Sequence, residues 1–247
     1  DRDQRGAEAQ GHQRIDDGTP ETMQDKAYAA WRADIDAGRA SILIADNHAA
    51  VRDLNIRAQA DRHPTSGQAV RLVDGTQAGV GDWIITRQND RRLRALRNGW
   101  VRNGDRWTIK DIRADGSVVV RRQDRPRAGG VVLPAAYVAE HVDLGYAITA
   151  HRAQGVTVDT AHVVVTEATT RENLYVAMTR GREQNHAYVI THEADEDHGA
   201  PDAQDAPTAK EVLTGVLANS GAELSATQTI KAEQETWGSI AQLAAEL

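Results

Sequence analysis

The pattern of apolar runs and turn residues changes twice along the chain, and this change most constrains the fold. Short apolar runs such as the "SILIAD" of 41–46 alternate with helical segments in the first and last parts, whereas 65–138 holds short alternating segments separated by Gly, Asn and Asp. Strand followed by helix is the unit of an α/β domain, and evenly spaced short strands are typical of a small barrel. We therefore expect an α/β domain interrupted by an antiparallel β-barrel.

Turn and capping residues mark several of these elements. Thr19-Pro20-Glu21 reads as N-cap, first-turn proline and first-turn acid, which predicts a helix to about Ala37 with Gly38 at its C-terminal cap. The next segment places Val51, Leu54 and Ala58 on one helical face. Inside the barrel region, the Asp-Gly pair at 115–116 predicts a hairpin turn.

Composition excludes some classes of protein and leaves others open. The chain of 247 residues has no cysteine, which excludes a disulfide framework and is compatible with the cytoplasm. No apolar run approaches the roughly 18 residues of a membrane span, the polar N-terminus shows no signal peptide, and the first residue is not Met. We expect a cytoplasmic fragment with no membrane partner.

Charge is distributed unevenly. The formal net charge is −7, yet 81–130 holds 13 Lys/Arg against 6 Asp/Glu. A local basic excess favours a nucleic-acid partner more than the total charge does. Arginine dominates over lysine, which suits phosphate recognition, although GC-rich coding explains the same bias.

Two motifs in the second half carry the chemistry. In "AITAHRAQGVTVD", Thr149 and His151 follow an expected strand, where loops of a parallel sheet present side chains to ligand. Gln154-Gly155 adds an amide and a close backbone approach. A helix expected through "RENLYVAMTRGRE" would carry Arg180 and Arg182 near its end, with Tyr175 and Met178 in the core. Arg182 is equally explained as a charge complementing that helix end.

These motifs resemble motif V and motif VI of superfamily 1 helicases. The resemblance covers about 25–193 and is strongest to the RecD-like branch, in particular to the helicase portion of TraA/TrwC-type conjugative relaxases. It implies a RecA-like second motor domain with an inserted SH3-like β-barrel. The implied division of the chain is 1–40 as linker and helix, 41–64 and 139–193 as the two parts of the RecA-like domain, 65–138 as the barrel, and 194–247 as an acidic linker and helical tail.

The resemblance also implies roles for individual residues. Arg180 matches the catalytic arginine that reaches the γ-phosphate of ATP on a neighbouring domain, while Thr149 and His151 match contacts to single-stranded DNA. The positions that couple DNA to ATP are Gln154, Gly155 and Thr157. The barrel residues implied as DNA contacts are Trp83, Arg87, Asn89 and Arg102. The implied motor moves 5′ to 3′.

The tryptophans and arginines of the barrel region leave alternatives open. Trp83, Trp100 and Trp107 fit the barrel's core and rim better than base-stacking platforms. The arginines at 91, 92, 94 and 97 form either a solvated loop or a track for phosphates.

Departures from the family pattern qualify the expected activity. The sequence contains no Gly-Lys pair and hence no Walker A loop. The "ADEDH" of 194–198 fits an acidic linker better than a Mg²⁺ site, and no metal-ligand spacing is present. We expect ATP and Mg²⁺ to bind only in a complete motor, with an N-terminal RecA-like domain as partner and nothing bound by this chain alone. The alternative is a non-catalytic nucleic-acid-binding or interaction module; a stand-alone hydrolase using His151 lacks support.

Overall fold

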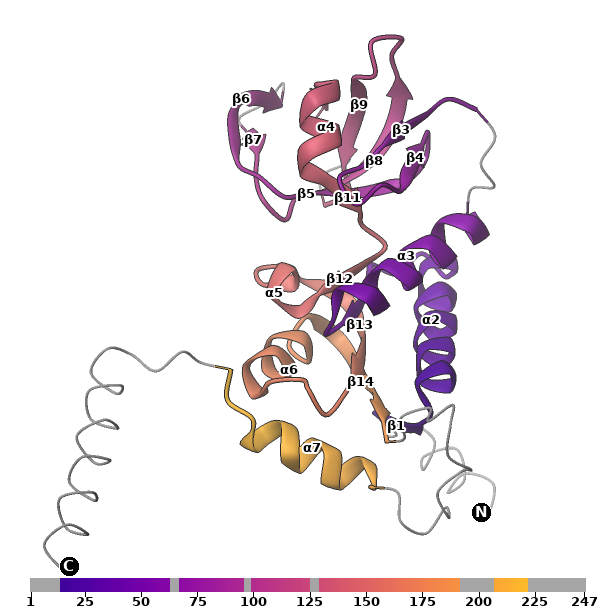
Figure 1. Ribbon diagram of the computed structural model, residues 1–247, viewed down its shortest axis with the longest axis vertical. Coiled ribbons are helices and arrows are strands. Elements are labelled where there is room, and N and C mark those ends of the chain that lie inside the picture. The colour runs from indigo at the N-terminus through magenta and orange to yellow at the C-terminus, as the bar shows by residue number, and fades with distance from the viewer. Residues whose placement is uncertain (1–13, 63–66, 96–98, 125–128, 192–206, 222–247) are drawn as a thin grey trace, which may run out of the picture.

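Two β-sheets of different kinds lie one above the other (Figure 1). The computed structural model describes residues 14–62, 67–95, 99–124, 129–191 and 207–221. The lower sheet is parallel and the upper sheet is antiparallel. The expected α/β class with a parallel sheet is confirmed. Within the described ranges, no helix has the length and apolarity that a membrane crossing requires.

The parallel sheet has five strands in the order β1-β14-β13-β2-β12. Every neighbouring pair is parallel. Its strands are β1 (Ile15–Gly18), β2 (Ser41–Ala45), β12 (Ala147–Thr149), β13 (Val158–Val165) and β14 (Gly181–Ile190). The two central strands, β13 and β2, are almost wholly buried because helices cover both faces.

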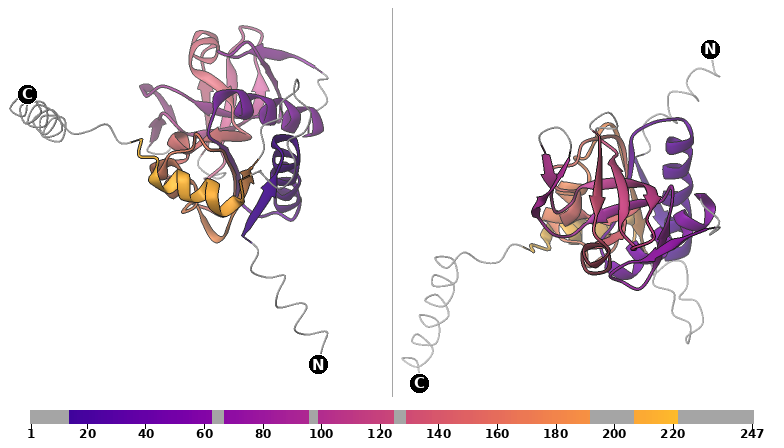
Figure 2. Two further views of the ribbon diagram at one scale, coloured as in Figure 1. Left: turned by 60° about the horizontal axis from the view of Figure 1, so that its bottom comes forward. Right: turned by 90° about the horizontal axis from the view of Figure 1, so that it is seen from above.

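Successive residues of β2 point to opposite faces of this sheet. Leu43 and Ala45 pack into the core beneath helices α2 (Pro20–Asp36) and α3 (His48–Arg62). Ile42 and Ile44 pack into a second core with residues of α5 (Ala150–Ala153), α6 (Arg171–Ala177) and α7 (Ala209–Ala218). In both views of Figure 2 the indigo helix α2 lies at the periphery of the molecule.

Local sequence signals account for the helix ends. Thr19 caps α2 by accepting a hydrogen bond from the Thr22 amide at 3.3 Å, and Gly38 adopts a φ of +79° two residues after the helix ends. Thr170 caps α6 in the same way, accepting from the Asn173 amide. The expected helices at both places are confirmed.

The inserted segment forms an antiparallel sheet between α3 and β12. Its order is β10-β9-β8-β5-β11, with the two-stranded pairs β3-β4 and β6-β7 beside it. The elements are β3 (Ala69–Arg71), β4 (Gln77–Gly79), β5 (Trp83–Thr86), β6 (Asp90–Ala95), β7 (Gly99–Val101), β8 (Arg106–Ile112), β9 (Val118–Arg122), β10 (Gly130–Leu133), α4 (Ala135–His141) and β11 (Val142–Leu144). The Asp115-Gly116 turn joins β8 to β9 as expected, with Gly116 at a φ of +79°. The SH3-like identity of this segment stays a prediction.

Aromatic side chains join the two layers. Trp31 of α2 meets Trp83 of β5 edge-on, with ring centroids 6.2 Å apart, and Trp83 stacks on Tyr146 at 5.5 Å. Tyr146 lies in the connection from the antiparallel sheet to β12. Its neighbour Gly145 passes so close to β5 that a Cβ there would lie 2.8 Å from the Ile84 carbonyl carbon. One continuous apolar core therefore runs from α2 into the antiparallel sheet.

Two expectations near motif VI are wrong. Helix α6 ends at Ala177 with Met178 as its C-cap, so Arg180 follows the helix and Arg182 belongs to strand β14. Tyr175 is 71 % exposed and does not enter the core, because it points away from the face that buries Ala177. Met178 does pack against the second core.

The acidic linker and most of the expected tail lie outside the described residues, as do "ADEDH", Arg97 and nearly all of the expected N-terminal linker. The described part of the tail contains α7, whose Thr208 and Glu211 form a complete capping box.

Candidate nucleic-acid interface

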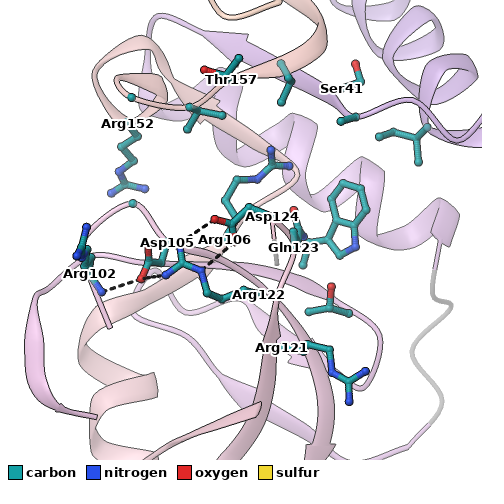
Figure 3. Close-up of a pocket in the computed structure, with 18 of the residues that line it drawn as sticks. Ser41, Arg102, Asp105, Arg106, Arg121, Arg122, Gln123, Asp124, Arg152 and Thr157 are labelled. Atoms are coloured by element: carbon teal, nitrogen blue, oxygen red, sulfur yellow. Dashed lines mark hydrogen bonds and ion pairs between the residues drawn. The ribbon is translucent and has the colours of Figure 1, made fainter. Parts of the chain in front are cut away.

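A cleft of about 1060 Å³ lies between the two layers. One wall comes from the parallel layer, through the loop before β2 and the loop from α5 to β13. The other wall comes from β8, the end of β9 and the turn before β8. Figure 3 shows Ser41, Thr157 and Arg152 on the first side and Arg106, Arg121 and Arg122 on the second. The layers thus enclose a groove whose two sides come from distant parts of the chain.

The residues of the motif V-like segment form much of the first wall. His151, Gln154, Gly155 and Thr157 line the cleft, and all four are exposed. Gly155 adopts a φ of +81°, a left-handed conformation that favours glycine and lets the backbone come close to a ligand. Thr149 does not line the cleft; it is the N-cap residue of α5, without a side-chain capping bond. The structure therefore brings four of the five predicted residues of this segment together.

Positive charge dominates the cleft. Its lining includes eight Lys/Arg and only two Asp. Three of the eight are held in ion pairs: Arg39 with Asp34, Arg152 with Asp143 at 2.8 Å, and Arg122 with both Asp105 and Asp124, each at 2.8 Å. These three arginines stabilise the walls, and their charges are largely neutralised.

Three further cations stand at the outer part of the second wall. Arg102, Lys110 and Arg121 are exposed and form no ion pair with the part of the chain that the structure describes. Lys110 lies on β8, and Arg121 pairs through the backbone with Thr108 of that strand. These charges are available to an anionic ligand. We call Arg102, Lys110 and Arg121 the outer cations.

The last two arginines of the cleft, Arg62 and Arg106, are more deeply placed. The Nε atoms of both are shielded from solvent and have no hydrogen-bond partner among the described residues. Both guanidinium groups lie over the Trp83 ring, at 4.5 and 5.6 Å from its centroid. Burial lowers the pKa of Arg106 to about 10, a value at which the group stays charged at neutral pH.

The barrel residues predicted as DNA contacts divide into two groups. Arg102 and Trp83 line the cleft, but Trp83 is half-buried, since it stacks on Tyr146 and contacts the guanidinium groups of Arg62 and Arg106. Arg87 lies outside the lining with its Nε 3.6 Å from Asp143, and Asn89 accepts a hydrogen bond from the Asn103 amide at 3.0 Å. Trp107 is buried, as its place in the barrel core predicted.

The sequence analysis did not identify Arg62, Arg106, Lys110 and Arg121 as members of one site. A signal was present in β8, where Trp107 and Ile109 are buried while Arg106, Thr108 and Lys110 alternate with them. In a strand, such alternation places the polar residues on one face. Which surface that face would meet could not be read from the sequence.

Arg180 lies outside the cleft lining, beside its first wall. Its guanidinium donates hydrogen bonds to the carbonyls of Val176 at 2.7 Å and Val156 at 3.2 Å, and to the hydroxyl of Thr179 at 2.8 Å. The next residue is Gly181, and this position has no room for a side chain, because a Cβ there would lie 2.1 Å from the Gln184 carbonyl oxygen. Val156 itself lines the cleft, so Arg180 is tied directly to the loop that forms the first wall.

Comparison with known proteins places this chain among bacterial relatives. The uncharacterized protein Rv2311 of Mycobacterium tuberculosis is 37% identical over 133 residues, which cover 53% of this chain and 72% of that protein. The chain belongs to the family of Rv2311. No protein-family profile matches it.

The conjugal transfer protein TraA of Agrobacterium fabrum is also a relative. It is 29% identical over 169 residues, which cover 66% of this chain and 15% of TraA. A probable conjugal transfer protein TraA of Sinorhizobium fredii is 30% identical over 165 residues, covering 65% of this chain and 14% of that protein. The predicted resemblance to TraA-type proteins is therefore confirmed, and the chain matches only about one seventh of their length.

Solved structures of Pif1 helicases show partial similarity. The Bacteroides Pif1 complex with ADP-AlF3 and ssDNA matches with a TM-score of 0.43 and 18% identity, covering 60% of this chain and 40% of that one. Pif1 from Candida albicans matches with a TM-score of 0.43 and 13% identity, covering 68% of this chain and 52% of that one.

Proposed function

We propose that this chain is the second motor segment of an ATP-dependent DNA helicase and that its cleft binds single-stranded DNA. The observation that carries the proposal is the cleft itself, in which four residues of the motif V-like segment lie across from the three outer cations. The relationship to TraA conjugal transfer proteins supports a role in DNA processing. The RecA-like identity of the parallel layer and the SH3-like identity of the insertion are parts of this proposal.

The chemistry of the cleft suits a sugar-phosphate backbone. The outer cations neutralise phosphates, and phosphate neutralisation supplies most of the affinity of sequence-independent binding. Across from them, the hydroxyl of Thr157, the amide of Gln154 and the accessible backbone at Gly155 offer hydrogen bonds to phosphate and sugar oxygens. We assign His151 and Thr149 to the same strand-binding surface, at the start of α5.

Arg180 is our candidate for the arginine finger. In the proposed motor it stabilises the transferring phosphoryl group of ATP–Mg²⁺ held by an N-terminal RecA-like domain of a longer protein. Its bond to the Val156 carbonyl connects it to the wall of the cleft. A strand that displaces this loop would alter the hold on Arg180, which gives a direct route for coupling DNA binding to ATP hydrolysis.

The alternative function is a nucleic-acid-binding module without catalysis. The absence of a Gly-Lys pair in the sequence favours it for this chain in isolation. Both functions use the same cleft, and they differ in whether Arg180 meets a nucleotide.

A salt titration tests the shared part of the proposal. We expect fluorescent single-stranded DNA to bind this chain more weakly at 200 than at 50 mM salt. Replacing the outer cations together (Arg102→Gln, Lys110→Gln and Arg121→Gln) should lower the slope of log K against log salt by about two, since each strand contact contributes roughly 0.7.

The control removes the same charge elsewhere. Arg52, Arg71 and Arg113 are exposed and lie outside the cleft lining. Their triple replacement by Gln should leave most of the slope in place. An equal decrease of the salt slope in the two triple variants would contradict the cleft as the binding site. ATP hydrolysis by this chain alone would contradict the proposal that it is only the second motor segment of a helicase.

A further inference from the structure

The two-stranded pair β6–β7 carries a second group of unpaired cations, outside the cleft lining. Arg91, Arg92 and Arg94 of β6 are exposed, and none of them forms an ion pair within the described ranges of the chain. Asp90, at the start of β6, accepts a hydrogen bond at 2.8 Å from the backbone amide of Arg92 rather than from a guanidinium group. The three charges therefore face solvent and can meet an anionic partner.

Trp100 of β7 connects these cations to the cleft. It lies directly opposite Arg94 in the antiparallel register, and residues directly opposite each other share one face of a sheet. The guanidinium groups of Arg91 and Arg102 lie over the Trp100 ring, at 5.5 and 5.1 Å from its centroid. Such contacts attract a cation to an aromatic face, and Arg102 is one of the outer cations of the cleft. Positive charge thus continues from the outer cations onto β6.

Apolar residues of the same two strands attach the β6–β7 pair to the antiparallel layer. Val101 is fully buried, and Leu93 packs against the same core. The arginines of β6 are therefore carried by a surface that is fixed to the layer. Figure 1 shows β6 and β7 at the side of the antiparallel layer, where a partner too wide for the cleft can reach them.

The partner that this surface fits best is duplex DNA. Sites for single strands combine positive charge with aromatic rings on which bases stack, whereas Trp100 is half-buried and already contacts two guanidinium groups. A duplex needs no such ring, because its bases are stacked inside it, and it presents one negative charge per roughly 1.7 Å of its axis. Arginine is well suited to phosphate oxygens, because its planar guanidinium donates two hydrogen bonds at once.

We propose that the β6–β7 pair binds the phosphate backbone of a DNA duplex, next to a single strand held in the cleft. The inference rests on the proposed function for the single-stranded part alone. The ligand of the whole chain is then a junction, in which the strand occupies the cleft and the duplex lies along β6. Arg102 marks the boundary between the two parts, since it lines the cleft and contacts Trp100.

A triple variant tests the duplex contact. It replaces the exposed arginines of β6 together (Arg91→Gln, Arg92→Gln and Arg94→Gln). The matched control is the triple variant of Arg52, Arg71 and Arg113, which removes the same charge from exposed positions elsewhere. Because all six side chains are exposed, both variants should keep the Tm of the original chain, so that changes in binding report on contacts and not on folding.

Three fluorescent probes separate the two parts of the junction. They are a single strand of about 10 nucleotides, a blunt duplex of about 15 base pairs, and the same duplex with that strand as a tail. We expect the original chain to bind the tailed duplex on the order of tenfold more tightly than the single strand. The β6 variant should lose most of this gain and most of its affinity for the blunt duplex, while its affinity for the single strand stays unchanged.

Salt dependence supplies a second readout on the tailed duplex. Each duplex phosphate that a cation neutralises contributes about 0.9 to the slope of log K against log salt, so the β6 variant should lower this slope by about two to three. The control should leave most of the slope in place.

The outcomes separate this inference from the proposed function. Equal losses of affinity for the single strand and the tailed duplex would make β6 an extension of the single-strand site and overturn the duplex contact. Unchanged duplex affinity in the β6 variant, or an equal loss in the control, would also overturn it. If the variant of the outer cations binds the single strand as tightly as the original chain, the cleft is not the strand site, and blunt-duplex binding still tests β6 by itself.

Discussion

At the scale of single residues, the buried histidine of the parallel sheet shows how ionisation is tied to folding. His162 of β13 lies with its Nε2 2.9 Å from Asp34 and its Nδ1 3.0 Å from the Tyr188 hydroxyl. Burial lowers the pKa of His162, and the hydrogen bond to Asp34 opposes that effect without outweighing it. Burial alone would raise the pKa of Asp34, but hydrogen bonds from Thr160, His162 and Arg39 lower it overall.

These directions predict an acid-labile fold. Because the pKa of His162 is lower in the folded chain than the 6.5 of an ordinary histidine, the unfolded chain binds more protons as pH falls through that value. The free energy of unfolding should therefore decrease from pH 7 to pH 5, measured by urea denaturation. In His162→Gln the decrease over this interval should be smaller.

An increase in the free energy of unfolding from pH 7 to pH 5 would contradict this prediction. If the ion pair with Asp34 outweighed burial, the pKa of His162 would be raised and stability would increase toward pH 5. Asp34 and Asp16, whose pKa values are lowered, lose their contribution only as pH falls below about 4, so they do not obscure the interval.

At the scale of elements, the sequence predicted what local physics decides. The cap at Thr19, the turn at Gly116 and the apolar strand β2 all lie where propensity and periodicity place them. The end of α6 was missed because the residues after Ala177 are compatible with a longer helix. The tertiary pairing of β14 with β13, from Gly181 onward, ends it instead.

Gly181 gives this pairing a sharp test. A Cβ at Gly181 would lie 2.1 Å from the Gln184 carbonyl oxygen and 3.0 Å from the Ala161 amide nitrogen, both backbone atoms of the two strands. Gly181→Ala should therefore lower the free energy of unfolding by about 1–3 kcal/mol or more, measured by urea denaturation. It should also shift the neighbouring Arg180.

Gly215 is the matched control, because it lies in α7 and a Cβ there meets nothing within 4 Å. Gly215→Ala should leave stability unchanged or raise it by up to about 1 kcal/mol, as alanine favours a helix. If both variants had the same stability, the close approach at Gly181 would not be what holds β14 in place.

At the scale of the whole molecule, the cleft could be predicted only in part. The motif V-like residues were identified from the sequence, because they carry a recognisable pattern on one short loop. Their partners across the cleft could not be, since Lys110 and Arg121 come from β8 and β9 of the inserted sheet. Only the packing of the antiparallel layer on the parallel one brings these segments together.

The cleft therefore depends on the contact between layers, and Trp31 is central to that contact. Its ring is fully buried in the core that includes both layers and meets Trp83 and Tyr146. We expect amides of β8–β9 and of β13–β14 in the original chain to exchange with solvent at one common free energy. Trp31→Ala should cost about 3–5 kcal/mol and lower the protection of β8–β9 first, because the cavity opens at the junction.

Met23 provides the comparison at the other end of the same helix. It is fully buried beside Gly18 of β1, within the parallel layer. Met23→Ala should cost about 2–5 kcal/mol but lower the protection of both sheets together. Since the cluster of Trp31, Trp83 and Tyr146 joins the two layers that form the cleft, Trp31→Ala should also weaken DNA binding under conditions where both variants remain folded, and Met23→Ala should not. Equal exchange and equal binding in the two variants would mean that the layers are held together by contacts other than this aromatic cluster.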